Sequence, residues 1–129
     1  MNFILLIGAV LGFSSLVMAA FLDHAIALHI TAKELNSLLT ALRYHQLYAV
    51  VISVMGMIMT FQISSVMKRR FVKVASTFLV GVLLFSCSIY VTYIFHFPNA
   101  IRLTPIGGVI LMLGWLGLAW IALSREEFK

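Results

Sequence analysis

Histidine is the residue type here with the widest chemistry, because a neutral imidazole binds metals and titrates near neutral pH. The chain has His24, His29, His45 and His96, and Asp23 precedes the first of them, where its carboxylate could ligate a metal or orient an imidazole. The spacing matches no metal-binding signature, because the first two histidines are five positions apart and the others lie in distant segments. We therefore expect no metal, haem or other cofactor.

Hydroxyl side chains gather in residues 84–97, LFSCSIYVTYIFHF. Ser88, Thr92 and His96 recur at helical spacing and share one face, while Ser86 and Tyr90 lie on another. These groups could form a polar track that an ion or small solute follows into the membrane. They could instead bond to backbone or to a neighbouring helix. The segment lacks the Asp, Glu, Lys or Arg typical of an intramembrane pathway, which favours the packing role.

Catalytic signatures are missing from the rest of the chain. The sequence contains no nucleophile–base–acid set, no phosphate-binding loop and no cysteine cluster, and Cys87 is its single cysteine. We therefore expect that the protein is not an enzyme.

Composition predicts an all-α membrane protein. Of the 129 residues, 63% are hydrophobic and 10% charged, and the mean hydropathy is +1.10, which is too apolar for a soluble domain of this size. Four stretches reach the roughly 20 residues that cross a bilayer, and we place transmembrane helices at about 3–22, 45–67, 72–96 and 104–124 in a single domain, 1–129. Val17 and Ala19 resemble a signal-peptide cleavage site, but MNFILL lacks a basic residue, so we favour a retained helix.

The segment between the first two crossings predicts a short amphipathic helix over 32–42. Thr31 and Glu34 have the spacing of a capping box, and leucines recur at helical intervals after it. We expect this helix on the outer membrane surface or over the bundle mouth. A continuous helix from Ala32 to Met67 is the alternative.

Basic residues predict the orientation. Lys68, Arg69, Arg70 and Lys73 form one cluster between the second and third crossings, which the positive-inside rule places in the cytoplasm. Both termini are then cytoplasmic, including Arg125 and Lys129, and the four histidines and Asp23 fall toward the outside. The net charge of +5 is explained by this topology, so we expect no nucleic-acid partner.

Small residues predict close helix packing. Gly8 and Gly12 form a GxxxG motif in the first crossing. In the fourth, Thr104 suits the N-cap and Pro105 the first helical position. The residues that we assign to packing are Gly8, Gly12, Ser86, Ser88, Tyr90, Gly107, Gly108 and Gly114.

These motifs resemble a family of small inner-membrane proteins related to YgdD, known as a domain of unknown function. The resemblance rests on AAFLDHA at 19–25, TALRY at 40–44, LFSCSIY at 84–90 and TPIGG at 104–108. Family members usually have GAFGAH where this chain has AAFLDH, glycine at the position of Cys87, and often histidine at that of Tyr48. The resemblance implies a compact four-helix protein of the bacterial inner membrane and no established activity.

The leading hypothesis is a non-enzymatic accessory or structural component of the membrane. Its partners would be the lipid bilayer and a larger membrane protein assembly or a homo-oligomer. The alternative is a protein that binds or transports a small ligand, ion or metal at the outer mouth of the bundle. That site would use Asp23, His24, Tyr44, His45, His96 and Arg102.

Overall fold

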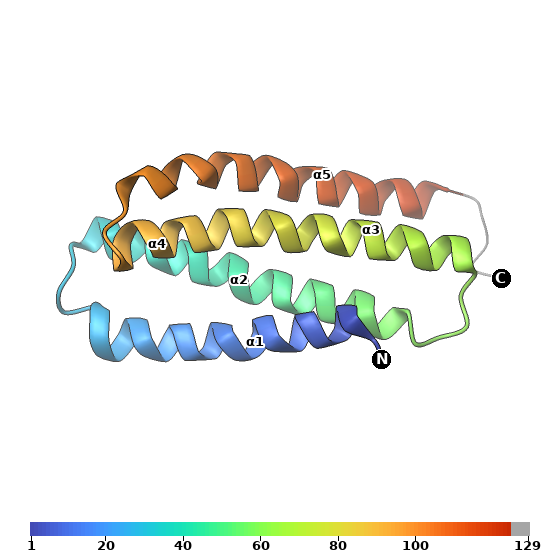
Figure 1. The fold of residues 1–129 in the computed structure, drawn as a ribbon, viewed down its shortest axis with the longest axis horizontal. Helices are drawn as coiled ribbons and strands as arrows, with labels where there is room; N and C mark the ends of the chain where they lie inside the picture. The colour runs from blue at the N-terminus through green and yellow to red at the C-terminus, as the bar shows by residue number, and fades with distance from the viewer. Residues whose placement is uncertain (125–129) are drawn as a thin grey trace.

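The computed structural model describes residues 1–124, which form helices joined by short turns and contain no strand. The predicted inner-side residues Arg125 and Lys129 lie outside the described range. The elements are α1 (Phe3–Phe21), a π-helical turn η1 (Leu22–Ile26), α2 (Ala32–Ile58), α3 (Ser65–Val82), a second π-helical turn η2 (Leu83–Cys87), α4 (Ser88–Ile94), a 3₁₀ helix η3 (Pro98–Leu103) and α5 (Thr104–Leu123) (Figure 1).

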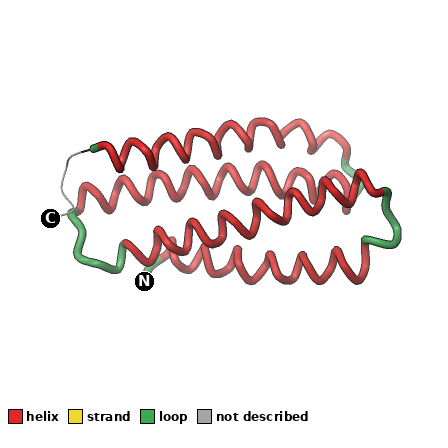
Figure 2. Tube along the Cα trace, turned by 180° about the vertical axis from the view of Figure 1, so that it is seen from behind, coloured by secondary structure: helices red, strands yellow, loops and turns green. Residues whose placement is uncertain are grey.

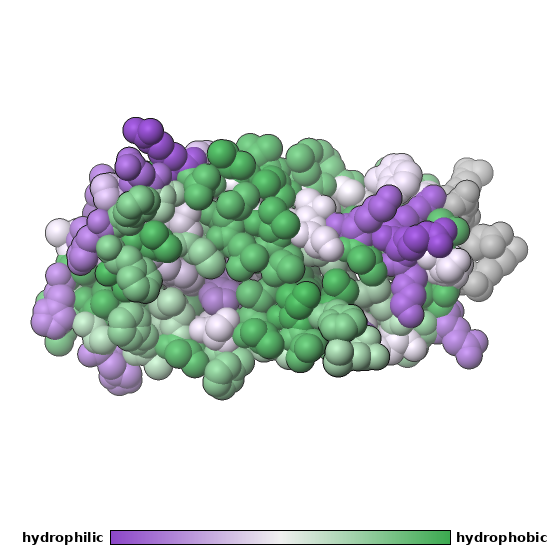
Figure 3. Space-filling view, viewed as in Figure 1, coloured by the Kyte–Doolittle hydropathy of each residue, from purple (hydrophilic) through white to green (hydrophobic). Residues whose placement is uncertain are grey.

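Four of these helical units are long and apolar enough to cross a membrane. They are α1 with η1, α2 alone, α3 through η2 into α4, and η3 with α5. This confirms the predicted all-helical architecture with four crossings. Figure 3 shows the consequence on one face, where an apolar middle zone separates hydrophilic residues at the two ends.

The two central units of the bundle are α2 and the α3–α4 unit. The α1 helix packs against α2, α5 packs against α3, and α2 contacts both α3 and α4 (Figures 1 and 2). The histidine end comprises η1, the start of α2, the end of α4, and η3. The basic end comprises the start of α1, the turn between α2 and α3, and the end of α5.

The segment 32–42 differs from expectation, because it is the beginning of α2 rather than a separate surface helix. The predicted capping box is present: the Thr31 hydroxyl accepts from the Glu34 N–H at 3.3 Å, and the Glu34 carboxylate accepts from the Thr31 N–H at 2.8 Å. Leu38 and Ala41 are fully buried in a cluster with Leu22, Ile89 and Tyr90. The leucine face therefore packs inside the bundle, which keeps the helix continuous.

The turn between α2 and α3 also differs from expectation. The second crossing ends at Ile58 rather than near residue 67, and α3 begins at Ser65. The Ser64 hydroxyl caps α3 by accepting from the Met67 N–H at 3.1 Å. The basic cluster therefore lies on the first turns of α3 instead of in a loop.

Glycines let the helices approach closely at particular places. A Cβ on Gly8 would lie 2.7 Å from the Ser53 backbone nitrogen, and one on Gly114 would lie 2.6 Å from the Phe78 ring. Gly107 faces the backbone of Leu84 and Phe85 in η2. By contrast, a Cβ on Gly12 would meet only the Ala49 methyl at 4.0 Å. The first glycine of GxxxG is therefore used within the chain, whereas the second borders open space.

Candidate functional site

His45 is the centre of a hydrogen-bonded layer inside the bundle. Its Nε2 lies 3.1 Å from the Ser14 hydroxyl and its Nδ1 lies 3.2 Å from the Tyr90 hydroxyl. The Ser14 hydroxyl donates its hydrogen to the Leu11 carbonyl at 3.0 Å, so its oxygen accepts from an Nε2–H and Nδ1 accepts from Tyr90. This network assigns the imidazole tautomer. His45 joins α1, α2 and α4, and it is buried rather than placed at a mouth.

Tyr48 and Trp115 form a second layer nearer the basic end. The indole Nε1–H donates to the Tyr48 hydroxyl at 2.8 Å. Phe78 packs on both rings, with centroid separations of 5.2 Å to Tyr48 and 5.4 Å to Trp115. Tyr48 is 2% exposed, so it is a core residue that ties α2 to α5, not an anchor at the membrane surface.

The hydroxyls of the LFSCSIY motif form hydrogen bonds to neighbouring helices within the bundle. Ser86 donates to the Ala41 carbonyl of α2 at 2.8 Å. The hydroxyls of Ser88 and Thr104, the latter in α5, form one hydrogen bond with an O–O distance of 2.6 Å. Thr92 donates back to the Ser88 carbonyl at 2.7 Å. Thr104 is thus the first residue of α5 and bonds to Ser88, instead of capping its own helix as predicted. Ser86 lies in the π-helical turn η2, which brings its hydroxyl to α2.

Four of the six residues predicted for an outer site lie exposed at the histidine end. Asp23 and His24 are in η1, Arg102 is in η3, and His96 follows α4 with a left-handed φ of 55°. Tyr44 lies farther along α2 and packs on the Phe85 ring at 4.7 Å. His45 is separated from the other five by its burial. Within residues 1–124, no three His, Cys, Asp or Glu side chains are placed to share a metal ion.

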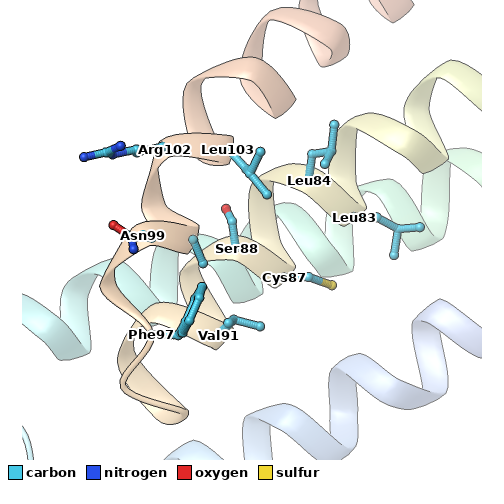
Figure 4. Close-up of a pocket in the computed structure, with 10 residues that line it drawn as sticks. Leu83, Leu84, Cys87, Ser88, Val91, Phe97, Asn99, Arg102 and Leu103 are labelled. Atoms are coloured by element: carbon cyan, nitrogen blue, oxygen red, sulfur yellow. The ribbon is translucent and has the colours of Figure 1, made fainter.

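A groove of about 530 Å³ opens between η2, α4 and η3 at the histidine end. Leu83, Cys87, Val91 and Phe97 supply much of its apolar lining (Figure 4). The Ser88 hydroxyl is already bonded to Thr104 at the start of α5, and the Arg102 side chain extends away from the other lining side chains (Figure 4). Arg102 is the one predicted outer-site residue that lines it. The groove therefore presents an almost wholly apolar surface to the membrane.

A different groove, of about 430 Å³, runs between α1 and α2, and we call it the α1–α2 groove. Most of its lining consists of small or apolar side chains, but Ser15, Gln46 and Ser53 are polar. Gln46 is near the middle of α2 and half-buried. No other side chain or backbone group within residues 1–124 forms a hydrogen bond with its amide. The lining residues are Gly8, Ala9, Gly12, Ser15, Leu16, Gln46, Ala49, Val50, Ser53 and Val54.

Gln46 is the residue that sequence reasoning missed. The second crossing was predicted to start at residue 45, so Gln46 fell at the expected membrane edge, where an amide would meet water. The continuous α2 helix instead places it well inside a crossing. The signal available in the sequence was an uncharged polar side chain directly before the apolar stretch that begins at Leu47, next to a histidine. Adjacent helix positions are rotated by about 100°, so the two face different surroundings.

The fold and the polar layers define a small multi-pass membrane protein whose interior polar side chains form hydrogen bonds between its helices. The chain belongs to the family described as "Protein of unknown function (DUF423)", which it matches over residues 18–108. It is also similar to a "UPF0382 membrane protein" of Haemophilus influenzae, at 31% identity over 114 residues that cover 87% of this chain and 86% of the relative. No solved structure matches the chain at a significant level. The predicted resemblance to an uncharacterised membrane family is confirmed.

Proposed function

We propose that the protein is a non-enzymatic accessory component of the bacterial inner membrane that binds a transmembrane helix of another membrane protein in the α1–α2 groove. The observation that carries this proposal is the Gln46 amide, which faces the groove near the middle of a crossing without a hydrogen-bond partner in the described chain. Lipid tails cannot satisfy it. An unpaired polar group in hydrocarbon costs several kcal/mol.

The groove suits a helix that carries a hydrogen-bonding side chain. Ala9, Gly12 and Ala49 are small enough to let a second backbone approach, and small residues with a polar side chain are typical of contacts between membrane helices. The expected occupant therefore has Ser, Thr, Asn or Gln at the depth of Gln46, between small or aliphatic residues.

The polar side chains inside the bundle already bond to one another. His45 pairs with Ser14 and Tyr90, and Tyr48 pairs with Trp115. Every buried side-chain nitrogen and oxygen of residues 1–124 has a partner. This supports a structural use of the interior polar groups.

The orientation that we propose places the basic end in the cytoplasm. Lys68, Arg69, Arg70 and Lys73 lie on the first turns of α3 at this end, and cytoplasmic ends of membrane helices are enriched in Lys and Arg. The start of α1 and the end of α5 lie at the same end (Figure 1), so both termini are cytoplasmic.

Photo-cross-linking in native membranes tests the docking site. A photoreactive phenylalanine analogue replaces Val50, which lines the groove and is 61% exposed, or Met112, which is 66% exposed on α5. We expect one discrete heavier adduct from position 50, lost when Gln46→Leu is added and kept with Gln62→Leu. Gln62 is the matched control because it lies in the turn between α2 and α3.

Three outcomes would overturn the proposal. An adduct of twice the chain mass would make a second copy of this chain the occupant. Lipid adducts alone at position 50 would leave the groove without a protein partner. Equal adducts from positions 50 and 112 would mean that contacts are nonspecific.

A further inference from the structure

A basic groove of about 240 Å³ lies between the start of α3 and the end of α5. Arg69, Arg70 and Lys73 line one side of it, while Val74, Gly117 and Trp120 contribute apolar surface. Figure 3 shows a hydrophilic patch at this end, bordered by the apolar zone that faces the membrane. Charge and apolar surface therefore meet in one hollow at the edge of the apolar zone.

The groove is held open and its cations are arranged by the fold. The Arg70 Nη1 donates to the Ser124 hydroxyl at 2.9 Å, and the Arg70 Cζ lies 4.7 Å from the Trp120 ring centroid. Arg69 and Lys73 are both exposed and one helical turn apart, so their charges lie on one face. A Cβ on Gly117 would lie 3.1 Å from the Val74 Cγ2, so the absence of a side chain leaves space here.

We propose that this groove binds the headgroup of an anionic phospholipid, with its phosphate at Arg69 and Lys73 and its acyl chains along the apolar surface of α5. Guanidinium and ammonium groups both bind phosphate oxygens, and a basic pocket between membrane helices suits an anionic headgroup. The two acidic residues within 1–124, Asp23 and Glu34, lie at the histidine end. The lipid belongs to the leaflet at the basic end.

Lys68 provides a matched control because it faces elsewhere. It belongs to the same helical turn as Arg69, but it lines a groove formed with Met1, Asn2, Met59 and Thr60. Lys68→Gln and Lys73→Gln therefore make the same change in charge near the same membrane surface. They differ in whether the lysine lines the basic groove.

Quenching of Trp120 by brominated lipids measures the binding. Trp120 lines the groove, and the Trp115→Phe background leaves it as the single tryptophan. The full chain in this background is reconstituted in vesicles that contain brominated phosphatidylglycerol or brominated phosphatidylcholine. We expect stronger quenching by phosphatidylglycerol. Lys73→Gln removes one of the two cations that contact the phosphate, so it should lower the selectivity sensed at Trp120 about fivefold. Lys73→Arg and Lys68→Gln should preserve it.

Equal quenching by the two lipids in the parent protein would overturn the proposal. An equal loss of selectivity in Lys68→Gln and Lys73→Gln would also overturn it, because general surface charge would then explain the preference. In the last control, inorganic phosphate is added at matched ionic strength and the quenching by the two lipids is compared again. If it abolishes the selectivity, the groove binds free phosphate rather than a lipid; we expect no effect.

Discussion

The two adjacent glycines of the TPIGG motif provide a matched pair for testing the packing of α5. A Cβ on Gly107 would lie 2.8 Å from the Leu84 carbonyl carbon and 2.9 Å from the Gly81 carbonyl oxygen, and would also meet the Phe85 backbone nitrogen. A Cβ on Gly108 would lie 3.8 Å from the nearest atom of the Phe85 ring. Alanine therefore overlaps fixed backbone at position 107 and makes an ordinary contact at 108.

The expected magnitude follows from these distances. At Gly107 the two carbonyl-group contacts fall 0.5–0.6 Å short of the 3.4 Å at which ordinary contact begins, and backbone atoms cannot rotate away. Overpacking of this kind costs about 1–3 kcal/mol. We expect Gly107→Ala to lower the free energy of unfolding by that amount, measured by SDS titration in mixed micelles with circular dichroism. Gly108→Ala should stay within about 0.5 kcal/mol of the parent.

Equal stabilities for the two alanine variants would refute this reasoning. It would mean that α5 does not approach η2 as closely as the structure shows.

Three further predictions concern the polar layers and the orientation. Ser14→Ala and Tyr90→Phe should each lower the free energy of unfolding by about 0.6 kcal/mol, and at most by about 1.7 kcal/mol. A double-mutant cycle should show coupling between them, because both side chains bond to the His45 imidazole. Strictly additive effects would contradict the shared layer. Trp115→Phe should destabilise the bundle by a similar amount, whereas Trp120→Phe should lower thermal stability less, because Trp120 is 57% exposed. In a Cys87→Ser background, Lys33→Cys should react with an impermeant maleimide in intact cells and Lys68→Cys only after lysis; the reverse pattern would invert the orientation.

Sequence patterns predicted the elements that depend on local chemistry. The apolar runs gave four crossings, and the Thr31–Glu34 spacing gave the start of a helix. Periodicity alone could not decide whether the leucines of 32–42 face a membrane surface or a protein core. That choice depends on Leu22 and Ile89, which are distant in sequence and cover them in the fold.

The candidate site was less predictable, because it depends on the rotation of α2. His45 and Gln46 are neighbours in sequence, yet one is bonded inside the bundle and the other faces the α1–α2 groove. The histidine attracted the chemical hypotheses, and its partners Ser14 and Tyr90 come from other helices. Such tertiary contacts have no signature in a single sequence.

The mass of the particle in native lipid tests the central claim most directly. The protein would be extracted from its own membranes in polymer nanodiscs, without detergent, and analysed by native mass spectrometry. For the wild type, the α1–α2 groove predicts a stoichiometric complex with a second membrane protein. Gln46→Leu should reduce it to the single chain with lipid, and Gln62→Leu should leave the complex intact. A wild-type particle that contains one chain and lipid alone would contradict the proposed function.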